Sequence, residues 1–134
     1  MLTQWVLGLD IGQRKTGVAV GQSLTGSATP LAIVRKAANA LQIADIRHWA
    51  EEWRVQAVVI GRPELADGKM HPLDHAITRF AEMIRRELYL PVHEVGEYLS
   101  SHEARERRGG RENVDDLAAC VLVEDYFAHV RSGG

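Results

Sequence analysis

The sequence has little cysteine and no long hydrophobic run. Its single cysteine, Cys120, excludes a disulfide within the chain and indicates a buried structural thiol, as is usual for a cytoplasmic protein. No uninterrupted apolar run of about 18 residues occurs, and no basic segment leads into an apolar one, so we expect neither a membrane span nor a secretory signal. These absences together predict a cytoplasmic protein that does not bind membranes.

Lysine is also scarce, whereas arginine is not. Of the 16 basic residues 13 are arginine, and the formal net charge is −2. That near-neutral charge does not by itself indicate a nucleic-acid-binding protein. Arginine binds phosphate groups in a bidentate way that lysine cannot, but arginine content also follows genome composition, so this bias has little weight. With 134 residues, of which 46% are hydrophobic, we expect one domain spanning residues 1–134.

Residues 7–20 combine two apolar runs with an acid and a tight turn. The first run reaches Asp10, the chain turns through Gly12 and Gly17, and a second apolar run follows. This pattern predicts two antiparallel strands joined by a short reversal. A carboxylate at the end of a buried strand is costly unless a cation, a metal ion or hydrogen bonds meet it. Asp10 is therefore either a functional acid or a residue that caps an ordinary turn.

Hydrophobic periodicity predicts the remaining elements. We expect strands at 5–10, 16–22, 28–34, 55–60 and 91–95, and helices at 38–53, from Pro72 to Leu88, after Ser100 or Ser101 and after Asn113. Pro30 favours an edge position for the third strand, or a place at the start of a strand. Because strand–helix–strand connections make strands parallel, the fold class is α/β with a five-stranded mixed sheet. We also expect a mobile loop at 105–112 and a disordered tail at 131–134.

Acidic residues fall where these elements end or begin. Asp10 ends the first strand, Glu97 follows the fifth, and Asp115 lies in the first turn of the last helix. The carboxyl ends of parallel strands share one edge of a sheet, so these acids are expected on one rim. Carboxylates so close need a cation, and oxygen ligands favour Mg²⁺ or Mn²⁺, a pair of which can cleave phosphodiesters. Taken singly, each acid could instead be a turn residue, a solvated loop acid or a helix-dipole partner.

Several short motifs occur in a fixed order along nearly the whole chain. They are Leu7-Gly8-Leu9-Asp10-Ile11-Gly12, Gly17-Val18-Ala19-Val20, Ala28-Thr29-Pro30-Leu31, Val58-Val59-Ile60-Gly61-Arg62-Pro63, Asp67-Gly68, Phe80-Ala81, Pro91-Val92, Leu99-Ser100-Ser101-His102-Glu103-Ala104 and Val114-Asp115-Asp116-Leu117-Ala118-Ala119. In this order they resemble the YqgF family of Holliday-junction-resolvase-like proteins, also described as nucleases that process the end of pre-16S ribosomal RNA. The resemblance implies an RNase H-like fold, with Asp10, Glu97 and Asp115 as catalytic acids that bind the metal.

The chain departs from that family pattern in two places, which leaves alternatives open. Gly96-Glu97-Tyr98 stands where the family usually has Asp-Glu-Arg, and Gln22 stands where it usually has Asp. The first hypothesis is a metal-dependent nuclease acting on the end of pre-16S rRNA or on Holliday-junction-like DNA. The second is a catalytically impaired nucleic-acid-binding or ribosome-biogenesis factor. A third is the phosphate loop of an actin-like ATPase, which 134 residues are too few to complete with two large domains.

Basic residues suited to the phosphate backbone lie near the expected rim. The candidates are Arg14, Lys15, Arg62, Arg105, Arg107, Arg108 and Arg111. Contacts of this kind make binding strongly salt-dependent. The alternative for the last four is a solvated charge run interrupted by Glu106 and Glu112. The expected partner is RNA or branched DNA. The protein is expected to be a monomer or a homodimer, because a junction resolvase favours a two-fold dimer whereas RNA-end trimming needs none.

Overall fold

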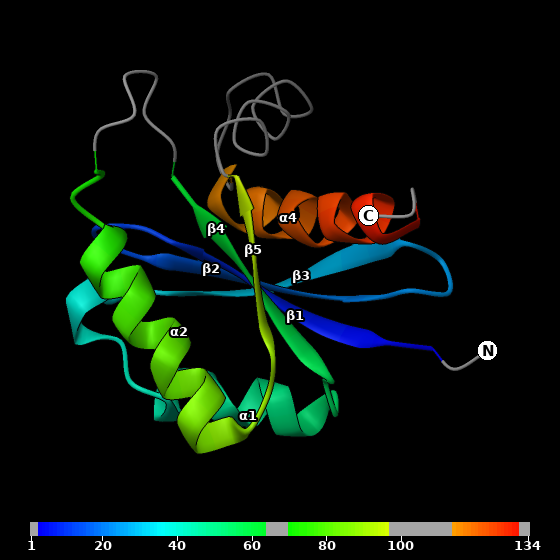
Figure 1. The fold of residues 1–134 in the computed structure, drawn as a ribbon, viewed down its shortest axis with the longest axis horizontal. Coiled ribbons are helices and arrows are strands. Elements are labelled where there is room, and N and C mark those ends of the chain that lie inside the picture. Colours follow the sequence, from blue (N-terminus) through cyan, green and yellow to red (C-terminus); the bar gives the residue numbers. More distant parts are fainter. Residues whose placement is uncertain (1–2, 64–69, 97–113, 132–134) are drawn as a thin grey trace.

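A five-stranded mixed sheet forms the centre of the computed structural model, which describes residues 3–63, 70–96 and 114–131, without the side chains of 114–116. Its strands, in the order β3-β2-β1-β4-β5, are β1 Trp5–Ile11, β2 Thr16–Gln22, β3 Ser27–Val34, β4 Ala57–Arg62 and β5 Val92–Gly96 (Figure 1). β1, β2 and β3 form an antiparallel meander, while β4 runs parallel to β1 and β5 parallel to β4. The predicted mixed sheet is confirmed.

The turn between β1 and β2 has the tight geometry that its glycines predict. The Gly12 N–H donates to the carbonyl oxygen of Lys15 at 2.9 Å, and in the ladder Asp10 lies opposite Gly17. Pro30 lies in β3, which is an edge strand as predicted. β3 has an irregular register there, because Leu31 is skipped between the partners of Val18 and Ala19. Such a bulge bends the edge of a sheet.

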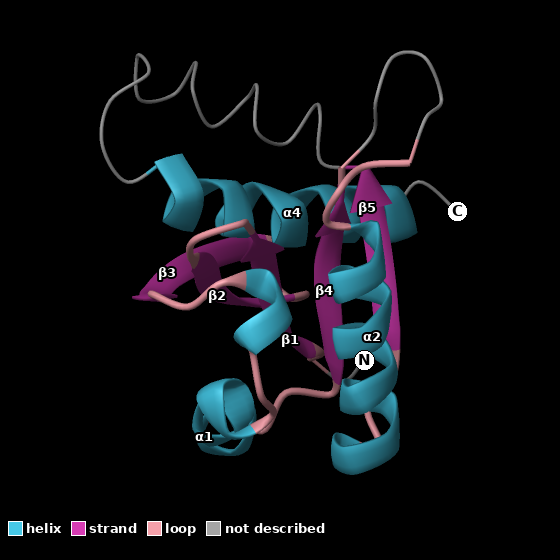
Figure 2. Cartoon of the chain, turned by 90° about the vertical axis from the view of Figure 1, so that its left-hand side faces the viewer, coloured by secondary structure: helices cyan, strands magenta, loops and turns pink. Residues whose placement is uncertain are grey.

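Helices cover both faces of the sheet (Figure 2). On one face, α1 (Ala44–Glu52) and α2 (Asp74–Leu88) bury apolar side chains against β1, β2 and β4; this core includes Leu9, Ile46, Phe80 and Ile84. On the other face, α4 (Val114–Arg131) packs with Val123 and Phe127 in its own cluster. β1 is buried from Val6 to Ile11 because helices lie on both of its sides, which explains its nearly continuous apolar sequence.

The helix expected at 38–53 is interrupted. A short 3-10 helix, η1 (Ala38–Ala40), is followed by Leu41 in an extended conformation, and α1 begins only at Ala44. Asp45 explains the break, because its carboxylate accepts the Gln42 N–H at 2.9 Å and so closes a turn before the helix. The buried residues of α1, Ile46 and Ala50, pack into the core on this face of the sheet.

Two further boundaries differ from the prediction. α2 begins at Asp74 and not in a turn containing Pro72, because the Asp74 carboxylate accepts the His71 N–H at 2.8 Å in a turn that precedes the helix. Arg131 is the last residue of α4 and does not belong to a disordered tail. The expected helix after Ser100 or Ser101, the expected loop at 105–112 and residues 132–134 lie outside the described residues. None of the helices in the described ranges combines the length and apolarity that a membrane crossing requires.

Candidate active site

Asp10 is a buried carboxylate on the face of the sheet that α4 covers. Its neighbours Leu9 and Ile11 belong to the core under α1 and α2, and alternation along a strand turns Asp10 to the opposite face. Asp10 is 7% exposed, and its Oδ1 has no hydrogen-bond partner within the described part of the chain. A buried carboxylate oxygen without a donor is destabilising unless a cation meets it.

α4 approaches the sheet closely beside Asp10 because β1 carries a glycine there. A Cβ atom at Gly8 would lie 2.9 Å from the carbonyl oxygen of Ala119 and would clash with the side chain of Val123. Gly8 precedes Asp10 by two strand residues, or ~7 Å, and residue 115 precedes Ala119 by four helical residues, or ~6 Å. α4 runs in the opposite direction to β1, so its first turn lies towards the end of β1, over β1 and β2 (Figure 1). The backbone of α4 therefore brings residue 115 towards Asp10.

The predicted trio of acids is placed only in part. The structure places Asp10 and the backbone of Asp115, whose side chain is not described, while Glu97 lies outside the described residues. β5 ends at Gly96, which pairs with Arg62 on β4, so Glu97 follows directly after the described strand. Among the side chains that are described, no group of three His, Cys, Asp or Glu residues is arranged to hold a metal ion.

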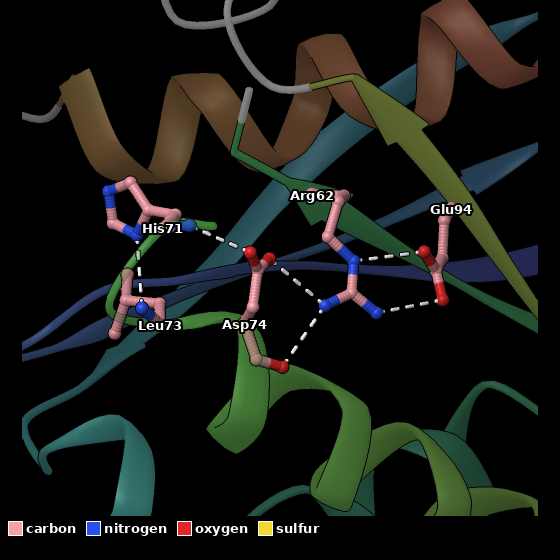
Figure 3. A network of polar contacts seen from close by, with 5 residues as sticks. All are labelled: Arg62, His71, Leu73, Asp74 and Glu94. Atoms are coloured by element: carbon pink, nitrogen blue, oxygen red, sulfur yellow. Dashed lines mark hydrogen bonds and ion pairs between the residues drawn. The ribbon is translucent and has the colours of Figure 1, made fainter. Parts of the chain in front are cut away.

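Arg62 forms an ion-pair network that links β4, β5 and α2 (Figure 3). Its Nε and Nη2 donate to the two carboxylate oxygens of Glu94 at 3.0 Å each. Its Nη1 donates to Asp74 Oδ1 at 3.2 Å and to the Asp74 carbonyl oxygen at 3.1 Å. The side chain of Arg62 is only 22% exposed. Arg62 was predicted to contact nucleic acid, and here four of its five N–H groups bind two acids of the same chain.

The network shifts the protonation equilibria of all three charged groups. Hydrogen bonding from Arg62 holds the pKa of Glu94 below its ordinary value, and the same bonds raise the pKa of Arg62. Partial burial raises the pKa of Asp74, but the His71 amide and Arg62 together outweigh it, so the net shift is downward. The network is therefore fully charged at neutral pH. The sequence analysis did not identify Glu94 and Asp74 as partners of Arg62. The one signal it offered was Glu94 itself, an acid on β5, the strand that pairs with the end of β4.

The other predicted basic residues fall into two groups. Arg14 and Lys15 lie in the β1–β2 turn, close in sequence to Asp10; Arg14 is exposed and Lys15 is partly buried. The four arginines Arg105, Arg107, Arg108 and Arg111 lie outside the described residues. The structure thus places two candidate phosphate contacts at the same end of the sheet as Asp10.

Comparison with known proteins identifies the family. The family model RuvX, described as Holliday junction resolvase, matches residues 4–129. The chain belongs to the RuvX family. This is the family that its motifs resemble under the name YqgF, and membership favours a nuclease over an actin-like ATPase.

Relatives and solved structures agree with membership of RuvX. A Legionella pneumophila (strain Lens) protein named "Putative pre-16S rRNA nuclease" is 38% identical over 129 residues, which cover 90% of this chain and 93% of that protein. Thermus thermophilus RuvC is similar in fold, with a TM-score of 0.62, 15% identity and 97% of each chain covered. RuvC from the same organism in complex with a Holliday junction substrate has a TM-score of 0.58, with 19% identity and coverage of 97% and 96%. The predicted RNase H-like fold is confirmed.

Proposed function

We propose that this RuvX protein is a divalent-metal-dependent nuclease that hydrolyses phosphodiester bonds in structured nucleic acid. The observation that carries the proposal is the buried Oδ1 of Asp10, which has no hydrogen-bond partner among the described residues and lies beside the first turns of α4. In a family of resolvase-like nucleases, a carboxylate oxygen that lacks a protein donor is suited to a cation.

Asp10, Glu97 and Asp115 would hold Mg²⁺ or Mn²⁺. The residues that the structure describes fit this role, because Asp10 offers a hard oxygen ligand in a buried setting that a cation would stabilise. Such an ion, when bound, activates water and stabilises the charge of the leaving oxygen. The sheet fixes Asp10, and the close approach of α4 fixes the separation between Asp10 and residue 115.

Arg14, Lys15, Arg105, Arg107, Arg108 and Arg111 would hold the phosphate backbone. Arg14 is exposed in the turn after Asp10, so it can reach a phosphate group next to the proposed metal site. For Arg62 we propose a positioning role, because its guanidinium already binds Glu94 and Asp74 and so fixes the end of β5 that precedes Glu97.

The substrate that we propose is the end of precursor 16S rRNA, with a four-way DNA junction as the second candidate. The name of the Legionella relative supports the first, and the family description together with the RuvC complex supports the second. Either activity would be carried out in the cytoplasm. The oligomeric state would follow the substrate, with a monomer sufficient for RNA ends and a two-fold homodimer suited to a junction.

The experiment that tests the function is a cleavage assay with Mg²⁺ or Mn²⁺ on a four-way junction, a duplex, a single strand and a precursor rRNA end. Wild-type protein is compared with Asp10→Asn and with Glu51→Gln, an exposed acid on the opposite face of the sheet. We expect metal-dependent products from the wild type and from Glu51→Gln, and none from Asp10→Asn. Undiminished cleavage by folded Asp10→Asn would falsify the assigned site.

The sequence Gly96-Glu97-Tyr98 supports one alternative, a nucleic-acid-binding factor with impaired catalysis. This alternative predicts salt-sensitive binding to one substrate of the panel, with no product from the wild type. Restoring the family pattern with Gly96→Asp and Tyr98→Arg would then produce cleavage. If the wild type already cleaves, the alternative is rejected.

A further inference from the structure

A groove runs along the outer edge of β5, on the side of the sheet that α4 covers. It has a volume of about 710 Å³, which is within the usual range for small-ligand sites. Val92–Gly96 of β5 lines one side and α4 contributes Tyr126 and His129, while Arg85 reaches the groove from α2. β5 pairs only with β4, so this edge carries no further strand in the described part of the chain.

Two stacked aromatic rings line this groove. The rings of His93 on β5 and Tyr126 on α4 lie 4.8 Å apart between centroids, with an angle of 27° between their planes. The Tyr126 ring also contacts Phe127, at a centroid distance of 5.6 Å, which anchors it to the core. Both His93 and Tyr126 are partly exposed. A partly exposed, anchored aromatic pair is a surface on which a flat ring can stack.

The charges around the groove are mixed. Arg85 is held at the edge, where its Nη2 donates to the Val92 carbonyl oxygen at 3.1 Å, and His129 is exposed on α4. Glu94 and Asp125 also line the groove, and the charge of Glu94 is met by Arg62. The groove therefore has no excess of positive charge for a run of phosphates. Its aromatic pair and hydrogen-bonding groups suit the flat, polar ring of a nucleobase.

We propose that this groove binds an unpaired nucleobase of the nucleic-acid substrate. The proposal rests on the nuclease function and gives it a substrate class, a structured nucleic acid with a single-stranded flank. The groove is continuous with the proposed active site along the chain, because Gly96 lines it and Glu97 follows directly. A strand that leaves the site along β5 would meet the stacked rings of His93 and Tyr126.

Binding of labelled oligonucleotides, followed by fluorescence anisotropy in EDTA, tests the proposal. The probes are a blunt duplex, the same duplex with a single-stranded overhang, and a third in which the overhang has no bases. Stacking of one base predicts that wild type binds the complete overhang at least about fivefold more tightly than the abasic one. Equal affinity for these two overhangs overturns the proposal.

Variants connect that preference to the groove. Tyr126→Leu should abolish the preference for bases, whereas Tyr126→Phe, which keeps the ring, should retain it. Arg85→Gln should weaken binding to both overhangs and lower the salt dependence by one phosphate contact, a log–log slope change of ~0.7. Arg86→Gln is the matched control, because Arg86 is the exposed neighbour on α2 and does not line the groove. A base preference that survives in Tyr126→Leu overturns the proposal.

His129→Ala is the second variant, for use if Tyr126→Leu does not fold. His129 lines the groove and is exposed, so its removal should leave the fold intact. A reduced base preference in His129→Ala is the expected result. If instead these variants change the oligomeric state and leave the base preference intact, the groove binds a second copy of the chain and the proposal fails. Metal-dependent cleavage of the same probes is measured separately. A wild type that prefers bases but does not cleave would reject the nuclease function and retain the groove.

Discussion

The guanidinium of Arg62 and the carboxylate of Glu94 meet side by side on neighbouring parallel strands, through two hydrogen bonds of 3.0 Å. This fork-to-fork geometry is the strongest form of an arginine–carboxylate pair. It also limits how a phosphate could interact with Arg62. Four of the five N–H groups already bind Glu94 and Asp74, so a bidentate phosphate contact would have to displace one of these acids. Two roles are therefore open to Arg62: it contacts the substrate, or it positions β5.

Glu94→Gln distinguishes these two roles. If Arg62 positions β5, the variant should cleave more slowly and bind nucleic acid as tightly as the wild type does. If Arg62 contacts phosphate, the variant should bind more tightly, because the competing carboxylate charge is gone. Affinity at several salt concentrations and single-turnover cleavage rates measure both quantities. Tighter binding with an unchanged rate would contradict the positioning role.

Removal of the guanidinium should also destabilise the protein. Arg62→Leu leaves Glu94 without its partner, and we expect a loss of about 1 kcal/mol in the free energy of unfolding, since this partly exposed pair is screened by solvent. Chemical denaturation measures the loss. Arg86→Leu is the control, because its ion pair with Glu87 is longer, at 3.6 Å, and more exposed. Equal losses in the two variants would mean that the network contributes nothing particular to stability.

The same network predicts how stability depends on pH. The pKa values of Glu94 and Asp74 are lowered in the folded protein from ordinary values of 4.5 and 3.8. Each carboxylate therefore binds protons less readily when folded than when unfolded. Its contribution to stability is complete above the ordinary pKa and is lost as the pH falls through the folded pKa. Thermal unfolding from pH 6 down to pH 3 should show a smaller loss for Glu94→Gln than for wild type.

Asp10→Asn should change the response to metal more than it changes the fold. Without metal, we expect a melting temperature equal to or above that of the wild type, because the amide removes a buried charge whose Oδ1 meets no donor from residues 3–63, 70–96 or 117–131. With Mn²⁺, the wild type should be stabilised through binding to the folded state and the variant should not. Differential scanning fluorimetry with and without Mn²⁺ measures this. An equal Mn²⁺-induced rise in both proteins would show that the ion binds elsewhere.

Gly8→Ala should weaken metal binding although residue 8 supplies no atom that would bind the metal. The added methyl group clashes with Val123 and the Ala119 backbone, so α4 must move and carry residue 115 with it. We expect a loss of about 1–3 kcal/mol in stability and a lower Mn²⁺ affinity by calorimetry. Gly21→Ala is the matched variant, because it also meets Val123 but pairs with Val6, further from Asp10. Similar Mn²⁺ affinities in the two variants would argue against the spacing role of Gly8.

The sequence predicted the parts of the fold that depend on local pattern. Alternating and continuous apolar runs located the strands, and Pro30 predicted the edge position of β3. The break at Leu41 was missed because helical periodicity reveals neither the turn that Asp45 closes nor the tertiary contacts that hold this segment. Arg79 on α2 donates to the carbonyl oxygens of Ala38, Asn39 and Leu41, which are far away in sequence. A helical periodicity cannot contain that information.

For the candidate site, the sequence predicts where Asp10 lies along its strand but not how Arg62 is partnered. Asp10 was recognised from its position after an apolar run, because a strand with one acid at its end is a local signal. The partners of Arg62 were missed because Glu94 lies 32 residues further along the chain, on a strand whose register the sequence does not determine. Gly8 was part of a motif, but its contact with α4 depends on how helix and sheet pack.

The irregular outer strand β3 has a consequence for self-association. Pro30 lacks an N–H donor and Leu31 interrupts the register, so β3 is a poor template for another strand. Any dimer that extends the sheet would therefore form at β5, and it would cover the groove beside His93 and Tyr126. Sheet-extending dimerisation and nucleobase binding would then be mutually exclusive, so a higher protein concentration would inhibit binding to overhangs and leave binding to blunt ends unchanged.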